Sequence, residues 1–457
     1  MNDKHGLLTQ PIGRVLLNMT LPNLLGILTV LGSSLVDMFF IGKLGTESLS
    51  AVSFTFPVTL VLSSIVIGIG AGLSTNLGRL IGSRNNHIAK VFLFDVMCFT
   101  LVIIAALSLL GLATIKPLFG LLGANATTLL LINDYMFYWF LSAPILAILM
   151  VGNQALRATG DTRPPAKIMM SAAIVNVILD PILIFGFGPI APLGLEGAAI
   201  ATSISWLVAL SVSSYLILIK RELVAFAAFN WQRILHNWRS LAHIARPATL
   251  MNMINPIANG VIMAMLARVD HSSVAAFGTG IRIESVLLIV VMALSSSLTP
   301  FIAQNLGAGQ PKRAKQALLM SLKFVFVLQT LLYIPLYFSA NFITHLFTSD
   351  PLVVDWLNFY LIVIPTAYGA LGMVIVFANS LNAYHQPVRS LMLNLTRLIL
   401  LLLPLAALGL VLGGVKGLLV ALPVTNMLMG IVSYILATKV AEPNKKQYHH
   451  ASDVAVE

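Results

Sequence analysis

The segment VLLNMTLPNLLGILTVLGSSLVDMFFIG, Val15 to Gly42, is an apolar run that contains one charged residue, Asp37. It is longer than the ~20 residues that a helix needs to cross the hydrocarbon layer of a bilayer. A carboxylate inside such a helix costs roughly 2.5 to 3.5 kcal/mol on insertion scales, so it is expected to have a function. The segment therefore predicts a membrane-spanning helix with Asp37 as a candidate functional residue.

Similar apolar windows recur along the whole chain. Of its 457 residues, 58% are hydrophobic and 9% are charged, whereas ~25% of residues are charged in an average soluble domain. This composition excludes an ordinary soluble fold and predicts an all-α integral membrane protein with twelve transmembrane helices. The windows are 15–40, 52–77, 91–115, 131–152, 168–187, 198–219, 245–267, 283–304, 318–340, 359–381, 390–412 and 417–437.

The net charge of +11 is distributed unevenly among the connections between these windows. Lysine and arginine gather after every second window, for example in 79–90, 157–167 and 312–315. By the positive-inside rule, this pattern predicts a multi-pass membrane protein with both termini in the cytoplasm. Membrane topology thus explains the basic charge, and we expect no nucleic-acid partner.

The two halves of the chain resemble each other at a shift of 225 residues, which places Pro22 on Pro247 and Gly82 on Gly307. Parallel repeats of this kind in transporters are related by an axis along the membrane normal. We therefore predict two six-helix bundles related by pseudo-two-fold symmetry. The predicted parts are an N-terminal lobe (1–219), a basic cytoplasmic linker (220–243), a C-terminal lobe (244–440) and a disordered cytoplasmic tail (441–457).

The repeat also serves as an internal control for the acidic residues. At the same shift Asp37 falls on Ile262, and the alignment of Pro181 with Pro404 sets Asp180 opposite Leu403. The second half is expected to adopt the same fold without these acids. We therefore expect these acids to have a chemical role in the first half and not a structural one.

Helix 5 of the prediction contains NVILDP, in which Asn176 and Asp180 are four residues apart and share one helix face. Pro181 lacks an N–H and leaves the carbonyl of Val177 without its helical partner. A carboxylate, an amide oxygen and a carbonyl are hard oxygen ligands, which suit a proton or Na⁺. The alternative is a kinked helix whose aspartate bonds a neighbour for packing only.

If Asp37 and Asp180 lie close together, their charges repel and the pair binds a proton as one coupled unit. Pro22 and Gly26 precede Asp37 in the same helix and predict a hinge. Close packing is the alternative explanation for both of these residues. Glu284 is a weaker candidate for an ion site in the second half, because a paired or hydrated helix end explains it equally well.

With LVDMFFIG, NVILDP and the loop NQALRATGDTRPP (153–165), the sequence resembles the multidrug and toxin extrusion (MATE) family over nearly its whole length. The paired acids make it more similar to the bacterial DinF-like branch than to the NorM branch. The resemblance implies a V-shaped antiporter that exports cationic or amphiphilic drugs in exchange for H⁺ or Na⁺. It implies a location in the bacterial cytoplasmic membrane and no cofactor besides this coupling ion, and we expect a monomer in the lipid bilayer.

The resemblance also implies roles for individual residues of the first lobe. The implied proton or cation site consists of Asp37, Asn176, Asp180, Tyr135 and Thr202. A bound Na⁺ would contact Asp37, Asn176, Asp180 and Thr202. Pro22 and Gly26 match the hinge, and Asn153 resembles a polar residue of the substrate cavity. The helix 7 acid of NorM-like members has no counterpart in 251–263, so we expect no second-lobe cation site of that type.

Two other functions compete with an exporter. An intramembrane aspartyl protease requires GxGD inside a membrane segment, whereas ATGD (158–161) lies in a basic loop. The motifs GxSxG, HExxH and the P-loop are absent from the sequence, so we expect no enzyme. A lipid-linked oligosaccharide flippase of the same superfamily would line its cavity with basic residues. Here we expect lysine and arginine to avoid the membrane centre.

Overall fold

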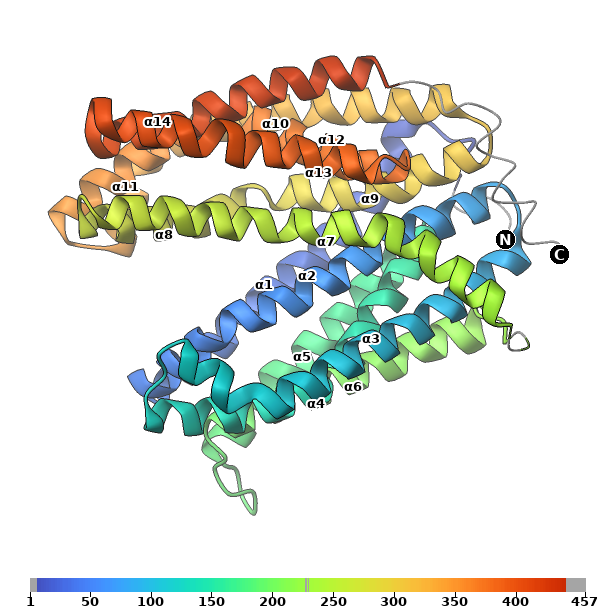
Figure 1. Cartoon of the computed structure of the whole chain (residues 1–457), viewed down its shortest axis with the longest axis horizontal. Coiled ribbons are helices and arrows are strands. Elements are labelled where there is room, and N and C mark those ends of the chain that lie inside the picture. The colour runs from blue at the N-terminus through green and yellow to red at the C-terminus, as the bar shows by residue number, and fades with distance from the viewer. Residues whose placement is uncertain (1–5, 227, 229, 441–457) are drawn as a thin grey trace. The chain divides into compact units, whose positions relative to one another are not determined.

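Helices make up almost all of the chain that the computed structural model describes, which comprises residues 6–226, 228 and 230–440. Figure 1 traces them from α1 in blue to α14 in red. The α-helices are α1 (Ile12–Lys43), α2 (Thr46–Gly82), α3 (Asn86–Leu121), α4 (Ala126–Ala158), α5 (Arg163–Phe185), α6 (Leu195–Ser214), α7 (Trp231–Ala267), α8 (His271–Leu287), α9 (Ile289–Gly307), α10 (Pro311–Phe347), α11 (Pro351–Val363), α12 (Tyr368–Ala383), α13 (Pro387–Leu395) and α14 (Leu403–Thr438). Three short helices of different pitch complete the order: the π-helices η1 (Tyr215–Lys220) and η3 (Thr396–Leu402) and the 3₁₀-helix η2 (Ile364–Ala367).

Eleven helical segments of the described chain are long and apolar enough to cross a membrane. The last of them, 387–438, contains two spans because the backbone turns at Gly413 and Gly414. Gly414 has φ of 59°, which favours glycine, and Gly409 and Gly417 allow the two arms to touch. A Cβ on Gly417 would lie 2.0 Å from the carbonyl oxygen of Gly409. The prediction of an all-α membrane fold with twelve helices is confirmed.

The helix boundaries repeat between the two halves of the chain with the same shift of 225 residues. The counterpart of α2 (46–82) is the pair α8 and α9, which together span 271–307. The counterpart of α4 (126–158) is the pair α11 and α12, which together span 351–383. The second-half helices are interrupted, by Leu288 and by η2, where the first-half helices are continuous.

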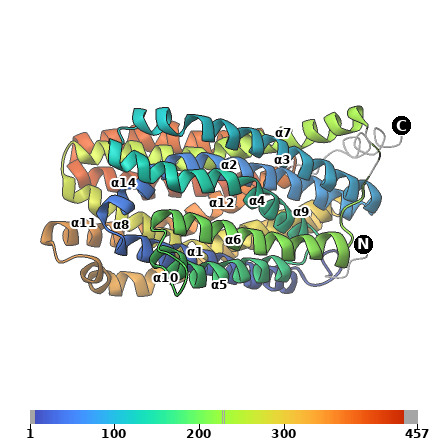
Figure 2. The same ribbon diagram turned by 90° about the horizontal axis from the view of Figure 1, so that it is seen from below.

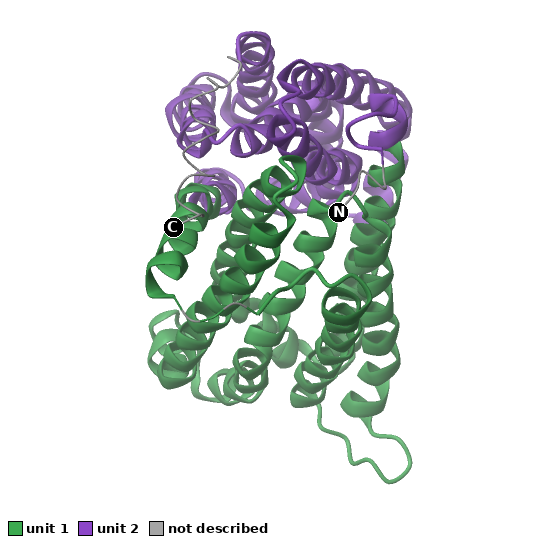
Figure 3. Ribbon diagram, turned by 90° about the vertical axis from the view of Figure 1, so that its right-hand side faces the viewer, with its two compact units in different colours: residues 1–5, 17–249 green, residues 6–16, 250–457 purple. Residues whose placement is uncertain are grey.

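The contacts within the chain divide its described part into two compact units, coloured separately in Figure 3. Unit 1 contains residues 17–249, and unit 2 contains residues 6–16 and 250–440. The start of α7 joins unit 1, where the indole of Trp238 donates to the Asp95 carbonyl at 2.9 Å. Much of the predicted linker 220–243 is thus helical. The division at residues 219 and 244 stays a prediction, and the predicted tail 441–457 lies outside the described residues.

In unit 1, α4 contacts α2, α3 and α6, and α5 packs along α6; Figure 2 gives a second view of these helices. Around α4 a buried core includes Phe119, Trp139 and Phe140. The approach of α5 to α6 is close, because a Cβ on Gly197 would lie 2.4 Å from the carbonyl oxygen of Leu183. These two closely packed helices, α5 and α6, carry three of the five predicted site residues.

Candidate functional site

Two aspartates from different helices meet inside unit 1. Asp37 lies on α1 and is partly buried, whereas Asp180 lies on α5 and is 0% exposed. Their side chains lie close enough to interact with each other, and Asp37 also interacts with Asn176. Within the described chain, Asp37 Oδ1 and Asp180 Oδ2 are buried oxygens without a hydrogen-bond partner. The pair therefore has two buried acceptor oxygens that receive no hydrogen bond from the described residues.

Asn176 connects the helices around this pair. Its Nδ2 donates to Asp180 Oδ1 at 3.1 Å and to the hydroxyl of Thr202 on α6 at 3.4 Å. Its Oδ1 accepts a hydrogen bond from the hydroxyl of Ser33 on α1 at 2.7 Å. The amide is thereby held in one orientation by three helices. Ser33 is a site residue that the sequence analysis did not identify.

Tyr135 of α4 faces the same group of residues and interacts electrostatically with both Asp37 and Asp180. The structure thus brings together all five residues of the predicted site, from α1, α4, α5 and α6. Carboxylate, amide and hydroxyl oxygens are ligands that suit Na⁺, Ca²⁺ or a proton and do not select transition metals. The described residues contain no cluster of three or more histidine, cysteine, aspartate or glutamate side chains. The role of the five residues in cation binding stays a prediction.

The proposed hinge residues lie one turn apart in α1, which runs as one helix from Ile12 to Lys43 through Pro22. Gly26 is buried, and a Cβ there would lie 3.3 Å from the Cα of Ala166 on α5. The hydroxyl of Thr162 donates to the carbonyl of Met19 at 2.8 Å. This hydrogen bond connects α1, three residues before Pro22, to the start of α5. Close packing therefore explains Gly26, and the hinge stays a prediction.

Asn153, predicted to line a substrate cavity, is 0% exposed on α4. Its Nδ2 lies 3.2 Å from the sulfur of Met169 on α5, and its Oδ1 is buried without a hydrogen-bond partner in the described chain. In this structure the side chain lies between α4 and α5. Its contact with substrate stays a prediction.

Unit 2 contains a second polar cluster that the sequence analysis largely missed. The hydroxyl of Tyr360 on α11 donates to Glu284 Oε2 of α8 at 3.2 Å. Arg397 of η3 is 6% exposed and interacts electrostatically with Glu284. A signal was present in the sequence, since Tyr360 is the counterpart of Tyr135 at the 225-residue shift. Arg397 is also an exception to the expectation that arginine avoids the apolar spans.

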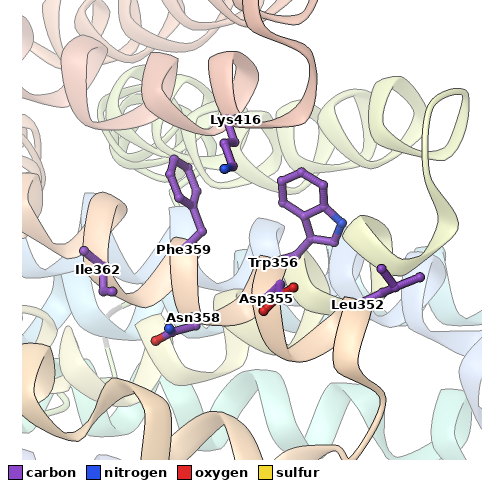
Figure 4. A pocket seen from close by; sticks show the side chains of 7 residues that line it. All are labelled: Leu352, Asp355, Trp356, Asn358, Phe359, Ile362 and Lys416. Atoms are coloured by element: carbon purple, nitrogen blue, oxygen red, sulfur yellow. The ribbon is translucent and has the colours of Figure 1, made fainter.

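Figure 4 shows a pocket in unit 2 that is lined by residues of α11 and α14. The volume of this pocket is about 410 Å³. Its lining residues are Leu352, Asp355, Trp356, Asn358, Phe359, Ile362 and Lys416. The Lys416 ammonium lies 5.7 Å from the centre of the Phe359 ring, and the Trp356 indole donates to Asp270 at 2.5 Å. None of the predicted site residues lines this pocket.

Known proteins resemble the chain over most of its length. A protein-family model described as MatE matches residues 22–182 and again residues 247–408. An FAD transporter of Shewanella oneidensis is 66% identical over 445 residues, which are 97% of this chain and 98% of the relative. The multidrug export protein MepA of Staphylococcus aureus is 28% identical over 386 residues, which are 82% of each chain. The crystal structure of the Vibrio cholerae MATE transporter VcmN in the bent form matches with a TM-score of 0.89 at 32% identity, covering 94% of this chain and 96% of that one.

These comparisons contradict the expectation of multidrug efflux. The 66% identical relative, which matches almost from end to end, is named for FAD. The relative named for multidrug export shares only 28% identity over a smaller part of the chain. The expected cargo was cationic or amphiphilic, whereas FAD carries a negatively charged diphosphate. The prediction of a multidrug exporter was therefore wrong.

Proposed function

Because the chain belongs to the MATE family of membrane transporters, we propose that it transports FAD across the bacterial cytoplasmic membrane. The observation that carries this proposal is the 66% identity to an FAD transporter over 97% of the chain. The family match confirms that the chain is a multi-pass transporter of small molecules and not an enzyme. The assignment to the DinF-like branch stays a prediction.

Asp37 and Asp180, we propose further, bind the coupling cation, H⁺ or Na⁺. Two carboxylates that lie close together repel each other, and a shared proton or a metal cation removes this repulsion. The proposed ligands of the cation are Asp37 Oδ1 and Asp180 Oδ2, which are buried and have no hydrogen-bond partner among the described residues. Thr202 and Tyr135 supply hydroxyl oxygens from α6 and α4, and Asn176 positions Asp180 by donating its Nδ2 to Asp180 Oδ1. This ligand set supports either cation.

The proposed orientation has both termini in the cytoplasm, with the chain acting as a monomer. Its support is the gathering of lysine and arginine after every second span, since basic residues are enriched in cytoplasmic connections. Labelling of single cysteines tests the orientation. Cys98 is the one natural cysteine, so a background without it needs a single substitution.

Reconstitution of the full chain in liposomes tests the proposed function. FAD is placed on one side, a pH gradient or a Na⁺ gradient is imposed separately in each direction, and flavin on the other side is quantified. We expect FAD flux above that of protein-free liposomes, driven by one of the two gradients. A folded protein that moves no FAD under any of the four gradients contradicts the assignment.

A further inference from the structure

One face of α7 in unit 2 is polar although the helix is apolar enough to span a membrane. Asn252, Asn255 and Asn259 recur at intervals of three and four residues and share one face of this helix. Asn255 is exposed, and no lipid-facing role explains an exposed amide on a spanning helix. The counterparts at the 225-residue shift are Ile27, Val30 and Ser34. The fold therefore does not require asparagine at these positions.

Arg397 of η3 adds a positive charge beside this polar face of α7. Its Nη2 donates to Asn255 Oδ1 at 2.7 Å, and its Nη1 donates to Asn426 Oδ1 of α14 at 3.0 Å. Its Nε is buried and has no hydrogen-bond partner in the described chain. No carboxylate of the described residues forms a salt bridge with it. The arginine is thus held by neutral amides, and its positive charge is not neutralised by direct contact.

The cluster that results is rich in hydrogen-bond donors. Because both amide oxygens accept from Arg397, the NH₂ groups of Asn255 and Asn426 remain as donors beside the unpartnered Nε. Arginine binds phosphate through its planar array of donors, and buried positive charge strengthens such contacts. Arg397 lies in a π-helix, and π-helical turns occur frequently at functional sites.

The internal repeat argues against a purely structural role for this arginine. With the shift that aligns Pro181 to Pro404, Arg397 falls on Ile174, an apolar residue of α5. A buried charge costs several kcal/mol of desolvation, so its presence in one half only calls for a function specific to that half. Glu284 interacts electrostatically with Arg397 but forms no salt bridge with it.

We propose that Arg397, Asn255 and Asn426 form an anion site that binds the diphosphate of FAD. The proposal rests on the proposed function, because that function supplies a substrate with this group. The three residues come from η3, α7 and α14, and all of them lie in unit 2. The phosphate oxygens accept from the Arg397 guanidinium and from the two amide NH₂ groups.

Binding of inorganic pyrophosphate and of FAD to the full chain in phosphatidylcholine nanodiscs tests this site. Arg397→Gln removes the charge and most of the donors, and we expect affinity for both ligands to fall roughly 10- to 100-fold. Arg397→Lys keeps the charge and is expected to lose less. The matched control is Arg389→Gln, since Arg389 is exposed and bonds only Gln386 within its own turn.

Unaltered pyrophosphate affinity in Arg397→Gln, or absence of pyrophosphate binding by the natural protein, overturns the anion site. Asn255→Ala provides a second variant that retains the buried arginine, and we expect a several-fold loss of affinity if Arg397→Gln does not fold. The proposed function can fail separately from the anion site. If the natural protein binds pyrophosphate through Arg397 but transports no FAD, the anion site is present and the chain is not an FAD transporter.

A lipid headgroup carries the same phosphate chemistry, and a further arm of the experiment separates it from a dinucleotide. The titrations are repeated in nanodiscs that contain phosphatidylglycerol. If this lipid competes with pyrophosphate, and Arg397→Gln leaves FAD affinity unchanged, the occupant is a lipid and the proposal is overturned. We expect FAD affinity to depend on Arg397 with and without the anionic lipid.

Discussion

Removal of the Ser33 hydroxyl tests the proposed cation site through a residue that bears no charge. The hydroxyl donates to Asn176 Oδ1 at 2.7 Å and fixes the amide that bonds Asp180. A hydrogen bond of this kind contributes about 0.5 to 1.5 kcal/mol net. Because 1.4 kcal/mol is tenfold in affinity, Ser33→Ala is expected to raise the half-saturating cation concentration roughly 2- to 12-fold.

The assay is FAD flux in proteoliposomes as a function of the driving cation, with flux at saturation as the internal reference. Ser34→Ala is the matched control, because Ser34 is the next residue of α1, is exposed, and donates only to the Val30 carbonyl of its own helix at 3.1 Å. We expect Ser34→Ala to behave as the natural protein. Equal half-saturating concentrations in both variants would refute the idea that Asn176 must be held in place for cation binding.

Three further substitutions test other parts of the structure. Asp180→Asn keeps an acceptor for its neighbour but loses the charge, so cation-driven FAD flux should fall roughly 10- to 100-fold with the thermal unfolding midpoint retained; full flux would exclude Asp180 as a ligand. Gly417→Ala places a Cβ 2.0 Å from a backbone oxygen and should lower the free energy of unfolding by about 1 to 3 kcal/mol, measured by thermal unfolding. In the control Gly260→Ala the new Cβ has no atom within 4 Å, so the free energy of unfolding should stay the same or rise. Asp95 is 1% exposed and accepts from Arg233 at 3.2 Å, so Asp95→Ala should cost on the order of 1 to 3 kcal/mol; an unchanged unfolding midpoint would contradict this.

Most of the helical layout was predictable from hydropathy and from the repeat, because both are properties of the local sequence. The windows 52–77 and 131–152 correspond to α2 and α4, which are longer than their apolar parts because polar turns continue both helices. The breaks in the second half were not predictable. The 3₁₀-helix η2 interrupts the window 359–381, and apolar content does not distinguish an α-helical turn from a 3₁₀ turn.

The aspartates of the candidate site were visible in the sequence because a lone carboxylate in an apolar run has few explanations. Ser33 was not visible, since a serine in a membrane helix commonly bonds its own backbone, as Ser34 does with Val30. Arg397 was missed because it lies inside the apolar window 390–412, and its partner Asn255 lies 142 residues away along the chain. Only the tertiary structure shows that these two side chains form one cluster.

The two units place a tyrosine at the same repeat position in different electrostatic surroundings. Tyr135 in unit 1 faces two carboxyl groups, Asp37 and Asp180, whereas its counterpart Tyr360 in unit 2 donates to Glu284, which interacts with Arg397. A tyrosine hydroxyl both donates and accepts, so the same residue suits a site for a cation and a site for an anion. A transporter that couples a cation to an anionic dinucleotide needs both kinds of site. On the two proposals, divergence of the two halves from one ancestral pattern supplies both sites without a change of fold.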